Sequence, residues 1–190
     1  EGLMLTYYRR NGLCAPHFTG GEQKPFTAAY VKEPHVGIHE WVVDVDITSS
    51  YPSHIIALNM SNETFYGNIV GLQEKEIINY VGKRKFPYFK IAKEINGEWT
   101  TIDFSDRNLD KFNNALERGL FAIAPCGAVF LTNKLGVVSD VEKSVFFKRK
   151  EVKEKRYEYW IKVNDSEGEE RKRLKERERE LDSLQLALKI

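Results

Sequence analysis

Apolar and polar positions divide the chain into two parts of different character. Up to about residue 134, short apolar runs alternate with Gly, Pro and Asn, a pattern typical of short strands and helices joined by turns. From Ser139 onward the sequence is highly charged, and its apolar residues recur at helical intervals. The pattern therefore predicts an α+β protein that ends in long helices.

The segment around Asp46 predicts a clear succession of elements. Residues 41–43 are apolar and mostly β-branched, which predicts a buried strand that leads into Asp46. Pro52 suits the first position of a helix that continues through residues 53–58. A strand, a tight turn and the start of a helix are therefore expected to follow one another here.

Other local patterns predict the elements on either side. Residues 1–40 contain several Gly and Pro residues, which indicates an irregular connecting segment with one strand at 28–31. Further along we expect a helix at 73–81 ended by Gly82, a hairpin of strands 89–95 and 99–104 around Asn96-Gly97, a helix at 106–118, and a second hairpin of strands 120–124 and 128–132.

Two long helices are expected in the charged part. Ser139 with Glu142, and Ser166 with Glu169, have the spacing of capping boxes, which mark helix starts. Each helix carries a narrow apolar seam. The seams consist of Val138, Val145, Val152 and Tyr159 in the first helix and of Leu174, Leu181, Leu184 and Leu188 in the second. Because only residues 163–165 separate them, the helices should fold back as an antiparallel hairpin about 34 Å long.

The turn after Asp46 has the features of a phosphate-binding turn. A turn that leads directly into a helix leaves the backbone N–H groups near Ser49, Ser50 and Tyr51 unpaired and aimed outward, the arrangement that holds a polyphosphate. Asp46 beside it offers a carboxylate to the divalent ions that such a phosphate needs. These residues together indicate nucleotidyl transfer.

Basic residues on the predicted hairpin suit the same ligand. Arg149 and Lys153 are four positions apart and therefore project from one face of a helix. Lys189 lies at the far end of the antiparallel partner, which brings it back near Arg149, and Gln185 shares its face. An Arg binds two phosphate oxygens at once, whereas each Lys acts as a point charge. Cations placed side by side in this way suit a triphosphate.

Several motifs resemble those of one enzyme family. Residues 46–53, Asp-Ile-Thr-Ser-Ser-Tyr-Pro-Ser, resemble the first catalytic-palm motif of family B DNA polymerases, D-x-x-S-x-Y-P-S. Residues 59–64 are similar to the T-even bacteriophage branch of that family. Residues 149–153 and 185–190 resemble further motifs of the family, in the right order, and residues 30–39 resemble its approach to the first motif.

The resemblance implies a fold and a division into domains. It implies part of a polymerase palm with an antiparallel two-helix fingers hairpin, within the α+β class. Residues 1–40 would be a connecting segment leading into the palm, residues 41–134 a partial palm domain with an insertion, and residues 135–190 the fingers hairpin. Because polymerases of this family are several times longer, we expect the chain to be a fragment.

The same resemblance implies roles for individual residues. Asp46 and Lys189 are expected to be catalytic, with two Mg²⁺ ions as cofactors that Asp46 bridges and the carbonyl of Ile47 helps to hold. The ring of Tyr51 is expected to lie under the sugar and to leave no room for a 2′-hydroxyl. The residues expected to bind the incoming nucleotide are Ser49, Ser50, Tyr51, Arg149, Lys153 and Lys189.

The resemblance and the sequence also lead to expectations about partners and location. Primer-template DNA and deoxynucleoside triphosphates are the expected ligands. A complementary polymerase chain carrying the remaining palm and thumb is expected as well, because one carboxylate cannot hold two metal ions firmly. The sequence has no signal peptide and no long apolar run, so we expect no membrane partner and a cytoplasmic location, in the host cell if the protein is viral. The net charge of +1 is compatible with a basic groove beside acidic metal ligands.

Two other function classes remain open from the sequence. The chain fits a non-catalytic nucleotide or nucleic-acid binding module, in which replacing Asp46 would be harmless. It also fits a helical-hairpin assembly protein, in which neutral residues at Arg149 and Lys153 would be tolerated. We interpret Asp44 as structural, and we interpret His35 and His39 in the same way because Pro34 and Gly37 disfavour the helix that would place the two imidazoles on one face.

Overall fold

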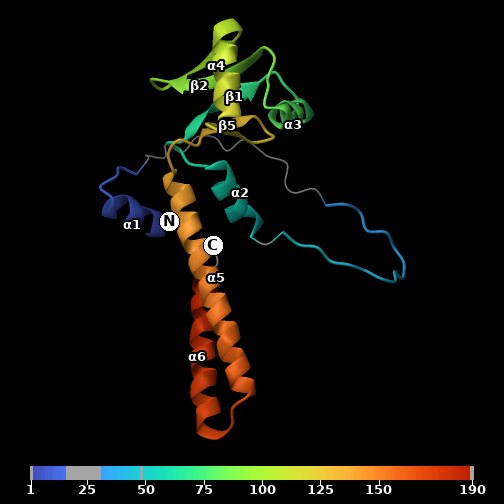
Figure 1. The fold of residues 1–190 in the computed structure, drawn as a ribbon, viewed down its shortest axis with the longest axis vertical. Helices are drawn as coiled ribbons and strands as arrows, with labels where there is room; N and C mark the ends of the chain where they lie inside the picture. Colours follow the sequence, from blue (N-terminus) through green and yellow to red (C-terminus); the bar gives the residue numbers. More distant parts are fainter. Residues whose placement is uncertain (1, 16–30, 48, 189–190) are drawn as a thin grey trace.

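The computed structural model describes residues 2–15, 31–47 and 49–188. A five-stranded sheet with helices packed against it lies at one end of the molecule, and two long helices, α5 and α6, run side by side away from it (Figure 1). A shorter helix, α2, packs against α5 near the base of this pair. The chain is an α+β protein, as the sequence predicts.

The helices and strands have the following bounds. The helices are α1 (Gly2–Arg10), α2 (Ser50–Leu58), α3 (Glu74–Lys83), α4 (Asp106–Glu117), α5 (Val137–Asn164) and α6 (Gly168–Ala187). The strands are β1 (Phe65–Val70), β2 (Phe89–Ile95), β3 (Glu98–Phe104), β4 (Phe121–Ile123) and β5 (Ala128–Leu131). Among the described residues, no helix is both long enough and apolar enough to cross a lipid bilayer.

The strands pair in the order β3-β2-β1-β5-β4, and every neighbouring pair is antiparallel. β2 and β3 form the hairpin predicted around Asn96-Gly97, where both residues have positive φ, as a tight two-residue hairpin turn requires. β4 and β5 form the second predicted hairpin. β1 lies between the hairpins and joins them into one sheet.

The central strand β1 is not predicted from the sequence. Gly67 interrupts its apolar pattern and lies at an irregularity in its pairing with β5. A Cβ atom at Gly67 would lie 2.6 Å from Ile91 Cγ2 and 2.7 Å from the carbonyl oxygen of Ala92, so only glycine lets β2 approach this closely. The strand at the centre of the sheet is therefore the one whose local pattern is weakest.

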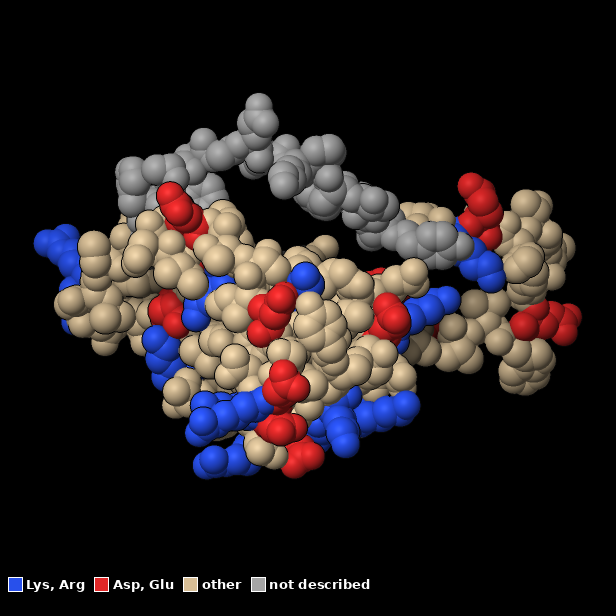
Figure 2. Space-filling view, turned by 90° about the horizontal axis from the view of Figure 1, so that it is seen from above, with Lys and Arg blue, Asp and Glu red and all other residues tan. Residues whose placement is uncertain are grey.

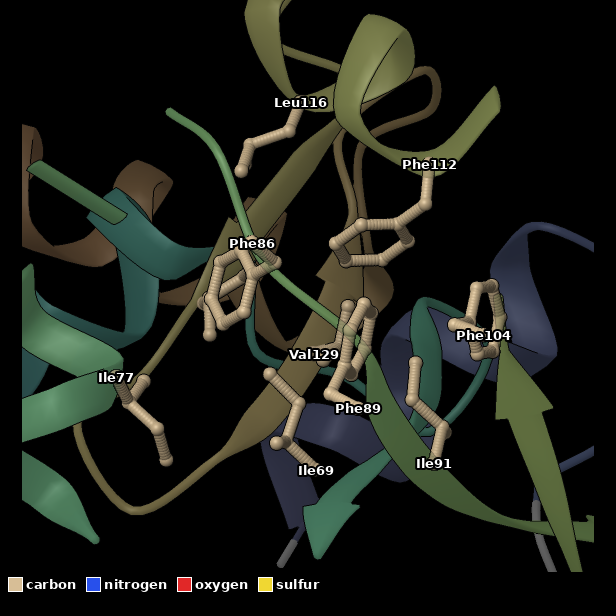
Figure 3. Close-up of a cluster of buried hydrophobic side chains, with 10 residues drawn as sticks. Ile69, Ile77, Phe86, Phe89, Ile91, Phe104, Phe112, Leu116 and Val129 are labelled. Atoms are coloured by element: carbon tan, nitrogen blue, oxygen red, sulfur yellow. The ribbon is translucent and has the colours of Figure 1, made fainter. Parts of the chain in front are cut away.

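Aromatic side chains form the core between the sheet and helix α4. Phe112 of α4 lies 4.8 Å from Phe89 and 4.9 Å from Phe121, measured between ring centroids. Phe89 in turn stacks on Phe104 at 5.0 Å. Figure 3 shows Phe112 and Leu116 pointing from α4 toward the side chains of the strands. The buried apolar cluster thus belongs to the sheet and its two helices, and α5 must be attached to this unit by other contacts.

Helices α3 and α4 agree with the sequence apart from one boundary. α4 forms where residues 106–118 predict a helix. α3 continues through Gly82 to Lys83, although the sequence predicts an end before Gly82, and Arg84 closes it in the left-handed conformation with φ 50°. A glycine inside a helix costs only about 1 kcal/mol. This cost is too small to end a helix whose apolar side packs on a core.

The strand predicted at residues 41–43 does not form. Trp41, Val42 and Val43 are 95%, 76% and 82% exposed, and residues 31–47 contain no helix or strand. An extended segment becomes a strand only when a neighbour accepts its ladder hydrogen bonds, and the described part of the chain provides no such neighbour here. Val31 of the strand predicted at 28–31 is likewise not in a strand, and residues 28–30 lie outside the described residues.

Helices α1 and α2 differ from what the sequence predicts. The segment expected to be irregular contains α1, whose Tyr8 is buried and whose Tyr7 hydroxyl donates a hydrogen bond to the carboxylate of Asp140 on α5. This hydrogen bond raises the pKa of Tyr7. Helix α2 begins at Ser50, so Pro52 is its third residue rather than its first.

Neither predicted capping box forms. Helix α5 begins at Val137, and Ser139 lies inside it and donates from Oγ to the carbonyl of Ile55 on α2, at 3.0 Å. Ser166 precedes α6 and donates from Oγ to the carbonyl of Lys162 at the end of α5, at 2.6 Å. Both serines therefore bind carbonyl groups of other helices, where the local pattern predicted contacts with N–H groups of their own helix.

Helices α5 and α6 pack along the predicted apolar seam. Val152, Val163 and Leu181 are buried, and the ion pair between Arg156 and Asp182 joins the two helices beside them. Leu184 is 44% exposed, so it lies at the margin of the seam. With 28 residues, α5 is about 42 Å long, which is longer than the sequence predicts.

A buried polar network joins α2 to the sheet and to α5. Asn59 ends α2 in the left-handed conformation, with φ 54°. Its Nδ2 donates to the carbonyl of Leu131 at 2.7 Å and to that of Lys134 at 2.8 Å. Its Oδ1 accepts the N–H of Gly136 at 2.9 Å. One amide side chain therefore ties the end of α2 to the end of β5 and to the residue before α5.

The same network holds the first turn of α5. The Glu63 carboxylate accepts the N–H of Val137, and Ser61 Oγ accepts the N–H of Val138 at 3.3 Å. A Cβ atom at Gly136 would lie 2.5 Å from the Cβ of Ser61, so glycine is needed for this approach. The polar residues that are buried in the described part of the chain all belong to this region: Asn59, Ser61, Thr64 and Ser139.

We expect Asn59→Ala to lower the free energy of unfolding by about 2–4 kcal/mol, because it removes three hydrogen bonds and leaves buried backbone groups without partners. Urea unfolding of both proteins, followed by circular dichroism, measures the difference. Asn108→Ala on the exposed face of α4 is the matched control. If both variants lost the same free energy of unfolding, the hydrogen bonds of Asn59 would not stabilise the fold.

Low pH should weaken the contact between the Glu63 carboxylate and the first turn of α5. Burial would raise the pKa of Glu63, but the hydrogen bonds from Val137 and Ser61 and the charge of Lys134 outweigh it and lower the pKa below 4.5. A carboxyl group with a lowered folded-state pKa stabilises the fold above its unfolded pKa, and this stabilisation is lost as the pH falls through the folded value.

We therefore expect the melting temperature to fall as the pH drops below about 4.5, and Glu63→Gln to remove part of that dependence. Thermal unfolding at a series of pH values tests this, with Glu74→Gln at the exposed start of α3 as control. If the melting temperatures of wild type and Glu63→Gln changed equally with pH, Glu63 would not be the source of the acid sensitivity.

Candidate functional site

A cleft of about 1170 Å³ opens between the start of α2 and one face of α5. The sequence singled out several of the residues that line it: Asp46, Ser49, Ser50, Tyr51, Arg149 and Lys153. They belong to two segments that are far apart in the sequence. The packing of α2 against α5 brings these segments together around one space.

The start of α2 forms one wall of the cleft. Ser49 precedes the helix in the left-handed conformation, with φ 52° and ψ 53°, and its carbonyl accepts the N–H of Ser53 at 3.0 Å. As first-turn residues, Ser50 and Tyr51 have N–H groups without an intrahelical acceptor, and Pro52 has no N–H. The positive end of the helix dipole and these N–H groups suit an anion at this wall.

Arg149 and Lys153 form the opposite wall. They lie one turn apart on α5, with Arg149 half-buried and Lys153 exposed. The ion pairs between described residues involve neither of them, whereas Lys155 pairs with Glu151 at 2.5 Å and Arg156 with Asp182. Two cations without acidic partners therefore face the helix start.

Three acidic residues also line the cleft, namely Glu142, Glu154 and Glu158. Glu142 lies at the inner end of the α5 face, and burial raises the pKa of its carboxyl group. Glu154 and Glu158 are exposed on the side of that face. The cleft thus contains charges of both signs, with the cations on the face of α5 that meets the start of α2.

Asp46 lies four positions before Ser50 in the sequence, and it lines the cleft. Ile47, expected to offer its carbonyl to a metal ion, is 66% exposed and is not among the lining residues. Among the described residues, no three His, Cys, Asp or Glu side chains gather in a group able to hold a metal ion. Asp46 is an oxygen ligand of the kind that Mg²⁺ prefers, yet these residues do not complete a two-ion site.

The position of Lys189 lies outside the described residues. Leu188, the residue before it, lines the cleft, so the C-terminal end of α6 reaches the site. Gln185 lies half-buried one turn earlier. The sequence prediction that the antiparallel helix returns toward Arg149 agrees with this course of the chain.

Lining residues that the sequence analysis did not single out lie on the same face of α5. Phe146, Lys150 and Tyr157 line the cleft. Phe146 lies three positions before Arg149 and Tyr157 eight positions after it, spacings that place both on its side of a helix, whereas Lys150 is its immediate neighbour. Helical periodicity counted outward from Arg149 would have found Phe146 and Tyr157 but not Lys150.

Comparisons with known proteins agree on one kind of relative. The chain is 39% identical over 96 residues to a protein named DNA polymerase from the archaeon Pyrococcus horikoshii, a match that covers 46% of this chain and 8% of that protein. It is 29% identical over 84 residues to the DNA-directed DNA polymerase of Escherichia phage RB69, covering 44% of this chain and 9% of that protein.

No protein-family model matches the chain, and no solved structure matches it. The chain spans less than a tenth of the length of the curated relatives described above. One of these relatives is archaeal and the other belongs to a phage, so they indicate no particular branch. The chain contains a segment that is related to DNA polymerases.

Proposed function

We propose that this chain forms part of the nucleotide site of a template-directed DNA polymerase, which adds deoxynucleotides to the 3′ end of a primer. The observation that carries the proposal is the meeting of Asp46 and the α2 start with Arg149 and Lys153 around one cleft. A triphosphate needs N–H donors, cations and a carboxylate that recruits metal ions. The similarity to DNA polymerases supports the same assignment.

In this proposal the two walls of the cleft bind the incoming nucleotide from opposite sides. The N–H groups of Ser49, Ser50 and Tyr51 donate to phosphate oxygens at one wall. Arg149 and Lys153 neutralise the triphosphate at the other wall, and Arg149 orients it because a guanidinium binds two oxygens at once. Lys189 would join them from the end of α6. Binding from two sides positions the α-phosphate for attack by the primer hydroxyl.

Tyr51 has a separate part in this proposal. It is 83% exposed and lines the cleft, so its ring is available to a ligand. We assign the ring to the space beneath the sugar, where it would leave no room for a 2′-hydroxyl. Such a contact would favour deoxynucleotides over ribonucleotides, because the 2′-hydroxyl is the group that distinguishes them.

A complementary chain completes the proposed enzyme. Bound Mg²⁺ ions activate the attacking hydroxyl and neutralise the leaving group in this type of reaction. Asp46 would hold them together with a second carboxylate, because no three His, Cys, Asp or Glu side chains gather as a metal-binding group among the described residues. We therefore assign the second carboxylate, the rest of the palm and the thumb to another polypeptide, which would also hold the primer-template DNA. The T-even phage branch remains part of the proposal on the strength of residues 59–64.

A second candidate is a module that binds nucleotides without turnover. The lack of a three-ligand metal group among the described residues favours it for the chain on its own. It keeps the roles of Arg149 and Lys153 and gives Asp46 none. Activity measurements on Asp46 variants therefore separate the two candidates.

We expect Asp46→Asn to reduce primer extension at least about a hundredfold, since it removes a charged metal ligand without changing the size of the side chain. The assay mixes the chain with a polypeptide that supplies the missing palm and thumb, in the presence of Mg²⁺, deoxynucleotides and a labelled primer-template. Asp44→Asn, an exposed neighbour in the same segment, is the control and should keep full activity. Extension that is unaffected by Asp46→Asn would rule out the polymerase assignment.

Nucleotide binding by the chain alone should depend on the two cations of α5. We expect Arg149→Ala and Lys153→Ala each to weaken binding of a deoxynucleoside triphosphate about ten- to a hundredfold, because each removes a charge-assisted contact. Isothermal titration calorimetry measures this, with the exposed Lys148→Ala as control. If all three variants bound alike, the triphosphate would not occupy this cleft.

A further inference from the structure

The face of α5 that lines the cleft continues toward the free end of the helix pair. From Arg149, the positions Lys153 and Tyr157 follow at one-turn intervals, and Trp160 follows Tyr157 after three residues. At 3.6 residues per turn these positions share one face. The stripe from Phe146 to Trp160 is roughly 21 Å long at 1.5 Å per residue.

Part of this stripe remains exposed beside the packing of the two helices. The side of α5 that meets α6 is marked by the buried Val152 and Val163 and by the ion pair of Arg156 with Asp182. Tyr157 and Trp160 are 62% and 46% exposed. Much of the surface of these two aromatic side chains is therefore open to a ligand.

The two aromatic rings form an ordered pair. The centroids of Tyr157 and Trp160 lie 5.8 Å apart, and the ring planes differ by 14°, a stacked arrangement. Tyr157 lines the cleft together with Lys150 and Lys153. A nearly parallel pair of exposed rings beside cations is the combination with which proteins bind single-stranded nucleic acid, because bases stack on the rings and the cations meet the phosphates.

Basic and acidic side chains lie near one another both at the sheet end of the molecule and in the cleft. Figure 2 shows the end of the molecule that carries the sheet, where Lys and Arg side chains are interspersed with Asp and Glu among the described residues. On α5, Arg149, Lys150 and Lys153 line the cleft beside the aromatic rings, and Glu154 and Glu158 line it as well. The stripe therefore suits a polyanion that also presents aromatic faces.

We propose that Tyr157 and Trp160 form a stacking platform for unpaired bases of a single DNA strand that enters the cleft along α5. The choice of DNA rests on the proposed polymerase function, in which an unpaired template strand lies ahead of the nucleotide site. Lys150 would meet its phosphates next to the rings. The platform extends the site beyond the residues that hold the triphosphate, and its contacts do not depend on turnover.

Binding of a fluorescein-labelled oligodeoxythymidylate to the whole chain, measured by fluorescence anisotropy, tests the platform. We expect Trp160→Ala to weaken binding about tenfold or more, since one stacked base is lost. Trp160→Phe should restore much of the affinity because it keeps an aromatic face. Trp99→Ala is the matched control, since Trp99 is 60% exposed but lies on β3 in the sheet.

Equal affinity of Trp160→Ala and wild type for the oligonucleotide would overturn the platform and would leave the stripe as a surface for another protein. Circular dichroism verifies that the variants are folded, which is expected because the ring is exposed. Nucleotide binding by the same variants separates this outcome from failure of the proposed function. A platform that fails while Arg149→Ala still weakens triphosphate binding leaves the polymerase assignment in place.

Discussion

The arrangement of the whole molecule depends on the hydrogen bonds of Asn59. The apolar core fills the space between the sheet and its own helices, so it does not position α2 relative to α5. The Asn59 amide, at the end of α2, binds the carbonyl of Leu131 and the N–H of Gly136 just before α5, and Ser139 binds α2 from within α5. Because unpaired polar groups are costly when buried, such a network tolerates few alternative arrangements. It is the constraint that keeps the two walls of the cleft facing each other.

The cleft combines a rigid part and an extended part. Arg149 and Lys153 stand on a long helix whose first turn is held by Glu63 and Ser61, so their positions relative to α2 are well determined. Asp46 instead lies in a segment without regular structure and with exposed apolar neighbours. The proposed metal ligand thus lies in the part of the cleft that has no regular secondary structure.

Local sequence patterns predicted most of the elements around the site. Asn96-Gly97 predicted a hairpin because few other residue pairs adopt two successive positive φ values. The seam of Val152 and Leu181 predicted the pairing of α5 with α6, since its spacing leaves one narrow side to be buried. The pattern failed at residues 41–43, where a strand needs a neighbour, and at Ser139 and Ser166, whose hydroxyl groups bind other helices. Short-range patterns contain no information about a strand neighbour or about the Ile55 acceptor of Ser139, which lies 84 positions away.

By itself, the sequence determined the chemistry of the candidate site, its helical spacing and the α+β class. The side chains of Asp46, Arg149 and Lys153 carry their charge in any fold, and a four-residue spacing puts the two cations on one face of any helix. Only the tertiary structure decided that these residues share a cleft with the start of α2 and that β1 joins two hairpins into a sheet. These relations depend on contacts between residues far apart in the chain, which form only when the buried network and the aromatic core are complete.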